Sequence, residues 1–296
     1  MSVIFLFIDG VGLGADDPSN PFSGKKYESF LAMSNDQPFT KFSETVQKKN
    51  HLFKPVDATL GVNGLPQSGT GQTALFTGKN APQKIGKHFG PFPHSGIKDY
   101  LRKESLFNRL KEREKTGHFI NAYPQIFFEK AEQRNRWSCT TLMTKSAGFP
   151  LNRTEDVKEG RAITAGINQQ AWREQLSIDV PVIEEKEAAD RLLNAAMDFD
   201  VVLYEYYLTD KAGHSQNLDK AESVIQTYDR FLLQLIKEKR AGDTLVLCSD
   251  HGNVEDLSTK THTFNKVPLF VLGPGAQELQ DAENIMDITP GILRMI

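Results

Sequence analysis

Residues 244–255, TLVLCSDHGNVE, decide which fold the rest of the chain must fit. The run LVL at 245–247 lacks the apolar/polar alternation of a half-exposed strand, which predicts a parallel strand covered on both faces. Asp250 and His251 follow this strand directly. In open α/β sheets, ligands bind beyond the carboxyl ends of the strands, so this pair is a candidate functional site. The same residues also fit a plain turn, with the aspartate as a cap and Gly-Asn reversing the chain.

The start of the chain repeats this pattern. Residues 3–8, VIFLFI, are rich in β-branched and aromatic side chains and predict a second buried strand that ends at Asp9. The following GVGLG at 10–14 has the wrong glycine spacing for a dinucleotide-binding loop, and Asp-Asp-Pro at 16–18 stands where its helix should begin. Two core strands therefore each deliver an aspartate to the same edge of the sheet.

Strand-like and helix-like patterns alternate along the remaining chain. Apolar side chains at helical spacing predict helices at residues 97–113, 184–197 and 218–239, with a further helix near 40–49. Strands are expected at 119–123, 201–206 and 267–272. This alternation predicts an α/β fold, a layered and mainly parallel sheet flanked by helices.

The middle of the chain differs in composition from its two flanks. Residues 79–181 are richer in arginine, lysine and aromatic residues and hold both tryptophans. We therefore expect a smaller inserted cap or subdomain at 79–181, and a core built from residues 1–78 and 182–296.

The bulk composition excludes several classes of protein. With 296 residues, of which 39% are hydrophobic, the chain can bury a large core. A formal net charge of −3 provides no overall field to attract nucleic acid or an anionic membrane. The two cysteines, Cys139 and Cys248, argue against a disulfide framework and for a reducing compartment. No segment has the pattern of a signal peptide or a membrane span. We expect a cytoplasmic protein without nucleic-acid or membrane partners; the sequence leaves its oligomeric state open.

Residues 65–78, LPQSGTGQTALFTG, predict a helix that starts near Ser68 and stops at Gly78. Small residues allow other groups to approach the backbone closely, and free amides at a helix start stabilise an anion. The segment is thus a candidate phosphate-binding site. The alternative is a Ser/Thr cap whose small residues simply pack against the sheet.

A set of acids and imidazoles lies after or beside the predicted strands: Asp9, Asp210, His214, Asp250, His251 and His262. Mixed carboxylate and imidazole ligands suit zinc or manganese, with magnesium less favoured. A pair of such ions can hold both the attacking and the leaving oxygen of a phosphoryl transfer, and a serine beside the pair becomes a nucleophile.

Five stretches resemble, in the same order, motifs of the alkaline phosphatase superfamily, and in particular its branch of cofactor-independent phosphoglycerate mutases and phosphopentomutases: FIDGVG, QSGTGQTALFTG, TDKAGH, SDHGN and THTFNKVP. The family nucleophile lies ten residues before the glycine that closes its helix and three before an inner glycine. Through Gly78 and Gly71, this resemblance selects Ser68 rather than Thr70. The resemblance covers the core on both sides of residues 79–181.

The resemblance also implies a ligand set for two divalent metal ions, manganese or zinc, with magnesium as a third option. One ion would be held by Asp210, His214 and His262, and the other by Asp9, Asp250, His251 and Ser68. The implied function is hydrolysis of a small phosphorylated metabolite, a phosphomonoester, through a phosphoserine at Ser68. The alternatives are an intramolecular phosphomutase acting on phosphoglycerate or a sugar phosphate, a phosphodiesterase, and a non-catalytic metal-binding module.

Substrate-binding residues are sought in the cap. Lys87, His88 and His94 form a basic stretch soon after the nucleophile helix and could contact phosphate, although such residues also serve as surface or packing residues. Four arginines could bind phosphate through bidentate contacts or simply be solvated: Arg134, Arg136, Arg153 and Arg161.

Overall fold

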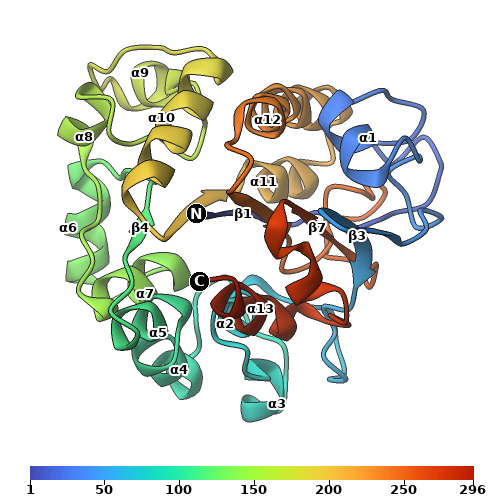
Figure 1. The fold of residues 1–296 in the computed structure, drawn as a ribbon, viewed down its shortest axis with the longest axis horizontal. Coiled ribbons are helices and arrows are strands. Elements are labelled where there is room, and N and C mark those ends of the chain that lie inside the picture. Colours follow the sequence, from blue (N-terminus) through green and yellow to red (C-terminus); the bar gives the residue numbers. More distant parts are fainter.

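The computed structural model describes residues 1–296 and contains one seven-stranded sheet between two layers of helices (Figure 1). The strands are β1 Val3–Ile8, β2 Val46–Lys48, β3 His51–Val56, β4 Gly117–Phe119, β5 Val201–Tyr206, β6 Thr244–Cys248 and β7 Val267–Leu272, in the spatial order β2-β3-β7-β6-β1-β5-β4. The four neighbours β6, β1, β5 and β4 are parallel, whereas β7, β3 and β2 pair antiparallel. The layered α/β class predicted from the sequence is confirmed, with a mixed sheet.

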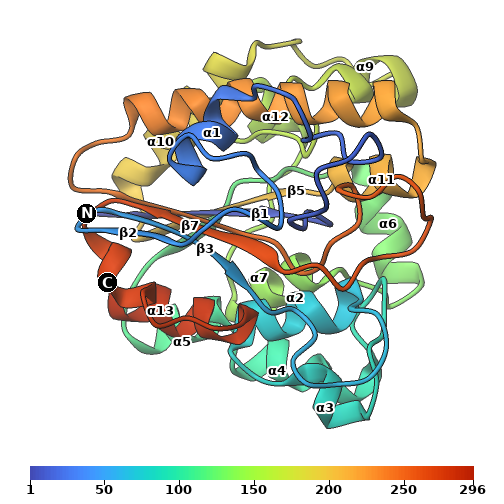
Figure 2. The same ribbon diagram turned by 90° about the vertical axis from the view of Figure 1, so that its right-hand side faces the viewer.

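Figure 2 shows the sheet from its edge, with helices on either side. One layer holds α1 Glu28–Ser34, α10 Glu185–Asp198, α11 Leu208–Ser215 and α12 Leu218–Glu238. The opposite layer holds α2 Ser68–Thr77, α3 Ala81–Ile85, α4 Lys98–Lys103, α5 Leu106–Glu112, α7 Cys139–Ala147 and α13 Ile288–Arg294. The remaining helices are α6 Gln125–Gln133, α8 Thr154–Lys158 and α9 Gln170–Leu176, with short 3-10 turns at Ser95–Ile97, Pro274–Leu279 and Ile285–Asp287.

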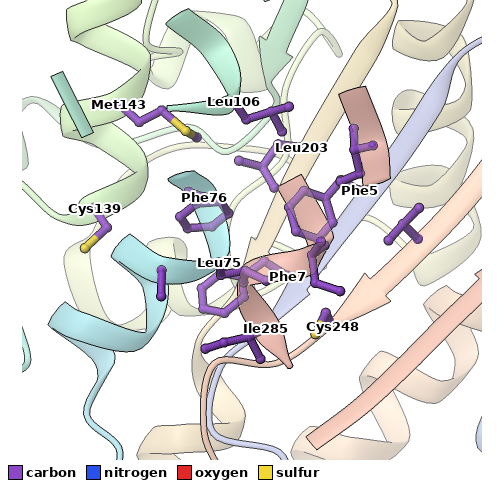
Figure 3. Packing of buried hydrophobic residues seen from close by; sticks show 14 of the residues in the cluster. Phe5, Phe7, Leu75, Phe76, Leu106, Cys139, Met143, Leu203, Cys248 and Ile285 are labelled. Carbon is purple, nitrogen blue, oxygen red and sulfur yellow. The ribbon is translucent and has the colours of Figure 1, made fainter. Parts of the chain in front are cut away.

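The two faces of the sheet each bury a hydrophobic cluster, because successive side chains of a strand point to opposite faces. In β1, Phe5 and Phe7 face the layer of α2, where both rings meet Phe76 edge-on, with centroids 5.9 and 5.4 Å away (Figure 3). Ile4 and Leu6 belong to the second cluster, with residues of α10 and α12. Burial on both faces explains why the sequence of β1 has no polar alternation.

The range 79–181 shares both the sheet and the core with the flanking sequence. Its strand β4 pairs with β5, Phe119 lying opposite Leu203, and its helices α4, α5 and α7 contribute to the same hydrophobic cluster as Phe5 and Phe7. A separate small cluster around Trp172 joins α8 and α9. The boundaries of the cap at 79 and 181 stay a prediction.

Three local predictions differ from the structure. The strand expected at 119–123 is β4, Gly117–Phe119, followed by isolated bridges at Asn121 and Ala122. The helix expected near 40–49 is absent; β2 and β3 form a hairpin there, because β3 pairs along its whole length with β7. The helix expected at 97–113 is two helices, separated at Glu104 and Ser105, where the Ser105 hydroxyl accepts a hydrogen bond from Asn108 N and starts α5. No helix has both the length and the hydropathy required to cross a membrane.

Candidate metal centre and adjoining cavity

The predicted ligands come together at the carboxyl end of the parallel strands, the right-hand end of the sheet in Figure 2. Asp9 follows β1 and Asp250 follows β6, while Asp210 lies on α11 immediately after β5. These three strands are adjacent and in parallel register, so their carboxyl ends meet. The sequence placed Asp210 and His214 in a loop; they lie one turn apart on α11, whose geometry brings residues i and i+4 to one face.

The first group consists of Asp9, Asp250, His251 and Ser68, and all four residues are buried. His251 Nε2 lies 3.0 Å from Ser68 Oγ, 3.3 Å from Asp9 Oδ1 and 3.4 Å from Asp250 Oδ2. The side chains of Asp250 and His251 are 0% exposed. Four polar side chains thus converge on one buried point; we call them the buried group.

The second group, Asp210, His214 and His262, is open to solvent on one side; we call it the open group. Asp210 Oδ2 lies 3.4 Å from His214 Nε2, and Asp210 Oδ1 lies 3.6 Å from His262 Nε2. The His214 side chain is 45% exposed. The rings of His262 and His251 stack with centroids 3.7 Å apart, so the two groups are contiguous and His251 faces both. Ligand atoms of Asp210, His251 and His262 also lie within 4.8 Å of one another.

The residues fit divalent cations. Asp9 Oδ1 and Asp250 Oδ2 are buried oxygens without a hydrogen-bond partner, which is costly unless a charge neutralises them. Burial and the nearby Asp250 raise the pKa of Asp9 well above its usual value, and burial and Asp210 raise the pKa of Asp250 to about 7. A bound cation would remove the repulsion that causes these shifts.

The imidazoles of the open group are held with Nε2 facing inward. His262 Nδ1 lies 2.7 Å from the Pro66 carbonyl oxygen and His214 Nδ1 lies 2.8 Å from the Lys260 carbonyl oxygen. Donation from Nδ1 to a carbonyl leaves the Nε2 lone pair free to bind a metal ion.

The open group differs from the buried one in its electrostatics. The hydrogen bond to Asp210 raises the pKa of His214 to about 9. Burial alone would raise the pKa of Asp210, but His214 and His251 lower it below its usual range. Burial and the neighbouring His251 lower the pKa of His262 to about 4. The open group therefore already contains a complementary acid and base.

Two glycines explain how the start of α2 reaches the centre. A Cβ at Gly69 would lie 2.2 Å from the Phe92 carbonyl oxygen, and one at Gly71 would lie 2.8 Å from the Asp250 carbonyl oxygen. Only glycine permits both approaches, which place Ser68 between the loop at 89–92 and the end of β6. The amide of Thr70 donates to the Phe89 carbonyl oxygen at 2.9 Å.

Sequence reasoning missed Glu255, which is buried behind the metal ligands. Its carboxylate accepts hydrogen bonds from the amides of Gly12 (2.9 Å) and Asn253 (2.7 Å), from the Asn265 side chain (3.0 Å) and from the Thr263 hydroxyl. Glu255 thereby joins the loops that carry Asp9, Asp250 and His262. Its place five residues after Asp250, in the stretch SDHGNVE, was the available signal.

Glu205 was also missed. It is the next-to-last residue of the apolar strand β5, is buried, and accepts hydrogen bonds from Thr140 Oγ1 at 2.7 Å and Tyr123 Oη at 3.4 Å. Burial raises its pKa to about 7. A glutamate inside the otherwise apolar run VVLYEY was the available signal.

A cavity of about 460 Å³ opens from this centre. Asp9, Ser68 and Asp210 line its floor, and residues from the range 79–181 supply much of its wall. A larger groove of about 870 Å³ near β3 and β7 contains none of the predicted site residues.

The basic residues predicted to bind substrate lie outside the lining of this cavity. His88 Nε2 lies 3.2 Å from the Val62 carbonyl oxygen, and His94 Nδ1 accepts a hydrogen bond from the Gly96 amide. Lys87 is exposed, with its ammonium group 5.9 Å from the centroid of the Phe89 ring. Their contacts serve the packing of the loop after α3.

Three of the four predicted arginines have partners in the protein. The Arg136 guanidinium lies 4.1 Å from the Phe92 ring centroid and that of Arg153 lies 4.0 Å from the Phe128 ring centroid. Arg161 pairs with Asp156 and Glu159, and Arg134 is exposed. None of the four lines the cavity.

Comparisons with known proteins show what this chain is similar to. Residues 174–296 match the family model described as Metalloenzyme superfamily. The chain is 33% identical over 137 residues to the 2,3-bisphosphoglycerate-independent phosphoglycerate mutase of Halobacterium salinarum, and 28% identical over 127 residues to that of Methylobacillus flagellatus. These matches cover 40% and 39% of this chain and only 27% and 25% of the two relatives, so they span about a quarter of each relative's length.

Solved structures show the same fold over nearly the whole chain. The alkaline phosphatase from the Antarctic bacterium TAB5 matches with a TM-score of 0.54 and 15% identity, covering 99% of this chain and 97% of its own. The Leishmania mexicana phosphoglycerate mutase matches with a TM-score of 0.53 and 12% identity, covering 99% and 95%. The chain therefore shares its fold with these two structures, its C-terminal part matches the metalloenzyme superfamily model, and about two fifths of it resembles the 2,3-bisphosphoglycerate-independent phosphoglycerate mutases.

Proposed function

We propose that the protein is a metal-dependent phosphatase that hydrolyses a small phosphomonoester through a phosphoserine at Ser68. The observation that carries the proposal is the convergence of Ser68 Oγ with Asp9, Asp250 and His251, where two carboxylate oxygens are buried without a partner. The similarity to alkaline phosphatases and phosphoglycerate mutases supports it. We further propose manganese or zinc as the ions, with magnesium as a third option, and the cytoplasm as the compartment.

Two divalent ions bound by the buried and open groups would neutralise the carboxylates, lower the pKa of the Ser68 hydroxyl and stabilise oxygens that gain negative charge. Asp9, Asp250 and His251 would hold one ion next to Ser68 Oγ, and Asp210, His214 and His262 would hold the other. The side chains of this chain would supply the rest: they place the nucleophile, and the cavity wall orients the ester.

The chemistry has two balanced steps. Ser68 Oγ loses its proton to solvent and forms a bond to phosphorus while the bond from phosphorus to the leaving oxygen breaks in line, and the leaving group departs as an alcohol after taking up a proton. Water then attacks the phosphoserine, the bond between Ser68 Oγ and phosphorus breaks, and inorganic phosphate leaves as the serine regains its proton.

The test compares two hydroxyls in the first turn of α2. With manganese or zinc present, turnover of p-nitrophenyl phosphate should fall by about four orders of magnitude in Ser68→Ala, as expected when a nucleophile is removed. Thr70→Val is the matched control, because the Thr70 hydroxyl bonds to the Gln67 carbonyl oxygen instead of facing His251. Acid quenching should trap phosphate on Ser68. Equal turnover in Ser68→Ala and wild type would disprove the assignment.

An intramolecular phosphomutase is the second candidate, favoured by the phosphoglycerate mutase relatives. Product analysis separates the two functions. A mutase converts 3-phosphoglycerate or a sugar phosphate to its isomer without net release of phosphate, whereas the phosphatase releases one phosphate per ester cleaved.

A further inference from the structure

The wall of the cavity beyond Ser68 is built from aromatic and aliphatic side chains. They include Phe92, Tyr123, Phe127, Trp172, Leu176 and Tyr207. They come from the loop before α4, from the start of α6, from α9 and from the end of β5. The Tyr123 and Phe127 rings are stacked with centroids 4.1 Å apart and an interplanar angle of 24°, so part of the wall is already ordered.

The ionisable side chains that line the cavity are mostly acidic. Besides the two predicted metal ligands, Asp9 and Asp210, the lining contains one further acid, Glu205, and a single base, Lys211. Glu205 accepts its hydrogen bonds from hydroxyl groups and has no cationic partner. The ammonium group of Lys211, an exposed residue, lies 5.8 Å from the centroid of the Tyr207 ring. A carboxylate on the substrate would therefore meet one solvated lysine and a carboxylate facing it.

Apolar side chains in this lining are left exposed to solvent. Leu176 is 48% exposed and Tyr207 is 37% exposed, and both line the cavity. Exposed apolar surface grouped around a concave site is the usual mark of a ligand that covers it. The aromatic wall and the scarcity of cations both favour a ligand that is flat and uncharged away from its phosphate.

We propose, building on the phosphoryl-transfer function above, that the substrate is a phosphoester whose leaving group carries an aromatic ring and no second anionic group. The phosphate would lie at Ser68 and the ring against Phe127 and Tyr123. A doubly anionic three-carbon substrate such as phosphoglycerate is disfavoured, because its carboxylate has no guanidinium or buried ammonium to bind.

Binding and turnover test this substrate class separately. Calorimetry on the manganese-loaded protein compares the binding of two non-hydrolysable phosphonates. Benzylphosphonate carries an aromatic ring, and 3-phosphonopropanoate carries a carboxylate in its place. Because its ring buries roughly 60 Å² of apolar surface, benzylphosphonate should bind with a Kd about tenfold lower than that of 3-phosphonopropanoate. For turnover, benzyl phosphate should exceed 3-phosphoglycerate by a similar factor in kcat/KM; both esters have primary alkoxide leaving groups, so intrinsic reactivity does not decide the comparison.

A charge variant sharpens the test. Leu176→Arg adds the missing cation to the cavity, so it should tighten 3-phosphonopropanoate binding and weaken benzylphosphonate binding, reducing the tenfold preference to less than about threefold. Leu218→Arg is the matched control, since Leu218 is 42% exposed and does not line the cavity, and the preference should be unchanged.

The outcomes distinguish this inference from the proposed function. Equal or tighter binding of 3-phosphonopropanoate by wild type overturns the aromatic substrate class, even if Ser68-dependent turnover of p-nitrophenyl phosphate is found. Preferential binding of benzylphosphonate with no turnover of any ester overturns the phosphatase function and leaves the ligand class supported. Preference for the benzyl compound in both assays, reduced by Leu176→Arg and unchanged by Leu218→Arg, supports both.

Discussion

The buried and open groups use similar side chains in opposite electrostatic settings. In the buried group, Asp9 and Asp250 lie close to each other in a buried setting, and their pKa values are raised. In the open group, Asp210 is paired with His214. The pKa of Asp210 is lowered and that of His214 is raised, and both shifts favour the charged forms. The open group is therefore stable without a cation, whereas the buried group carries a penalty that only a cation or protons remove.

This difference implies that the two ions would have different roles. An ion in the buried group would contribute to folding as well as to catalysis, because it relieves carboxylate repulsion in a medium of low dielectric constant. An ion in the open group would exchange more readily, since His214 is accessible and its acid-base pair persists without metal.

The largest expected effect is a contrast in metal affinity. Asp250→Asn should weaken the tighter manganese site by at least about a thousandfold, because a buried charged ligand is lost. His214→Asn should weaken the second site by only about tenfold, because the exposed imidazole is replaceable by water. Titration with competing chelators measures both constants. Equal losses in the two variants would remove the distinction between the groups.

The second effect is a pH dependence of the free energy of unfolding of the metal-free protein. The pKa of Asp250 is about 7 in the folded state, against an ordinary value of 3.8 for an aspartate. The unfolded state therefore releases this proton first as pH rises, and folded stability declines between about pH 4 and pH 7 by up to about 4 kcal/mol. Urea unfolding in EDTA at pH 4.5 and 7.5 measures it.

Asp250→Asn is the control for this pH dependence. It removes the titrating group, so without metal the variant should gain stability relative to wild type as pH rises. Added manganese should reverse the order at pH 7.5. A constant difference between the two proteins across this range would show that Asp250 ionises freely in the folded state.

A third effect concerns Glu255, which connects both groups. Glu255→Gln keeps the shape but replaces charged hydrogen bonds to Gly12 and Asn253 by weaker ones. Because a charge-assisted hydrogen bond contributes more than a neutral one, we expect a loss of about 2 kcal/mol in the free energy of unfolding. Weaker metal binding at both groups should accompany it, measured by chelator competition. An effect confined to one group would mean that Glu255 does not couple the loops.

The smallest expected effect is a loss of metal affinity when a side-chain amide that hydrogen-bonds to a metal ligand is removed, because each group has its own such amide. Asn253 Nδ2 donates to Asp210 Oδ1 at 2.6 Å, and Gln72 Nε2 donates to Asp9 Oδ2 at 3.3 Å. Loss of a hydrogen bond that orients a ligand weakens metal affinity by about tenfold. Asn253→Ala should do so at the open group, and Gln72→Leu at the buried group. Crossed effects in chelator titrations would contradict the assignment of the ligands to two groups.

Strand β1, strand β5 and helix α2 were predictable because each is specified by a local pattern. Residues 3–8 and 201–206 are uninterrupted apolar runs or nearly so, and Gly78 closes the helix that starts at Ser68. The hairpin of β2 and β3 could not be predicted in this way, because His51–Val56 becomes a strand by pairing with β7, more than 200 residues away. The sequence pattern had predicted a helix near 40–49, a range that includes β2.

The sequence by itself determined that acids and imidazoles would follow the strands and that a serine would start a glycine-rich helix, because strand ends and helix starts are local events. Only the tertiary structure decided that His251 faces both groups, that Glu255 joins three loops, and that aromatic side chains rather than His88 or His94 line the cavity. These features depend on contacts between residues far apart in the chain, and the packing of the sheet and its two helical layers sets them.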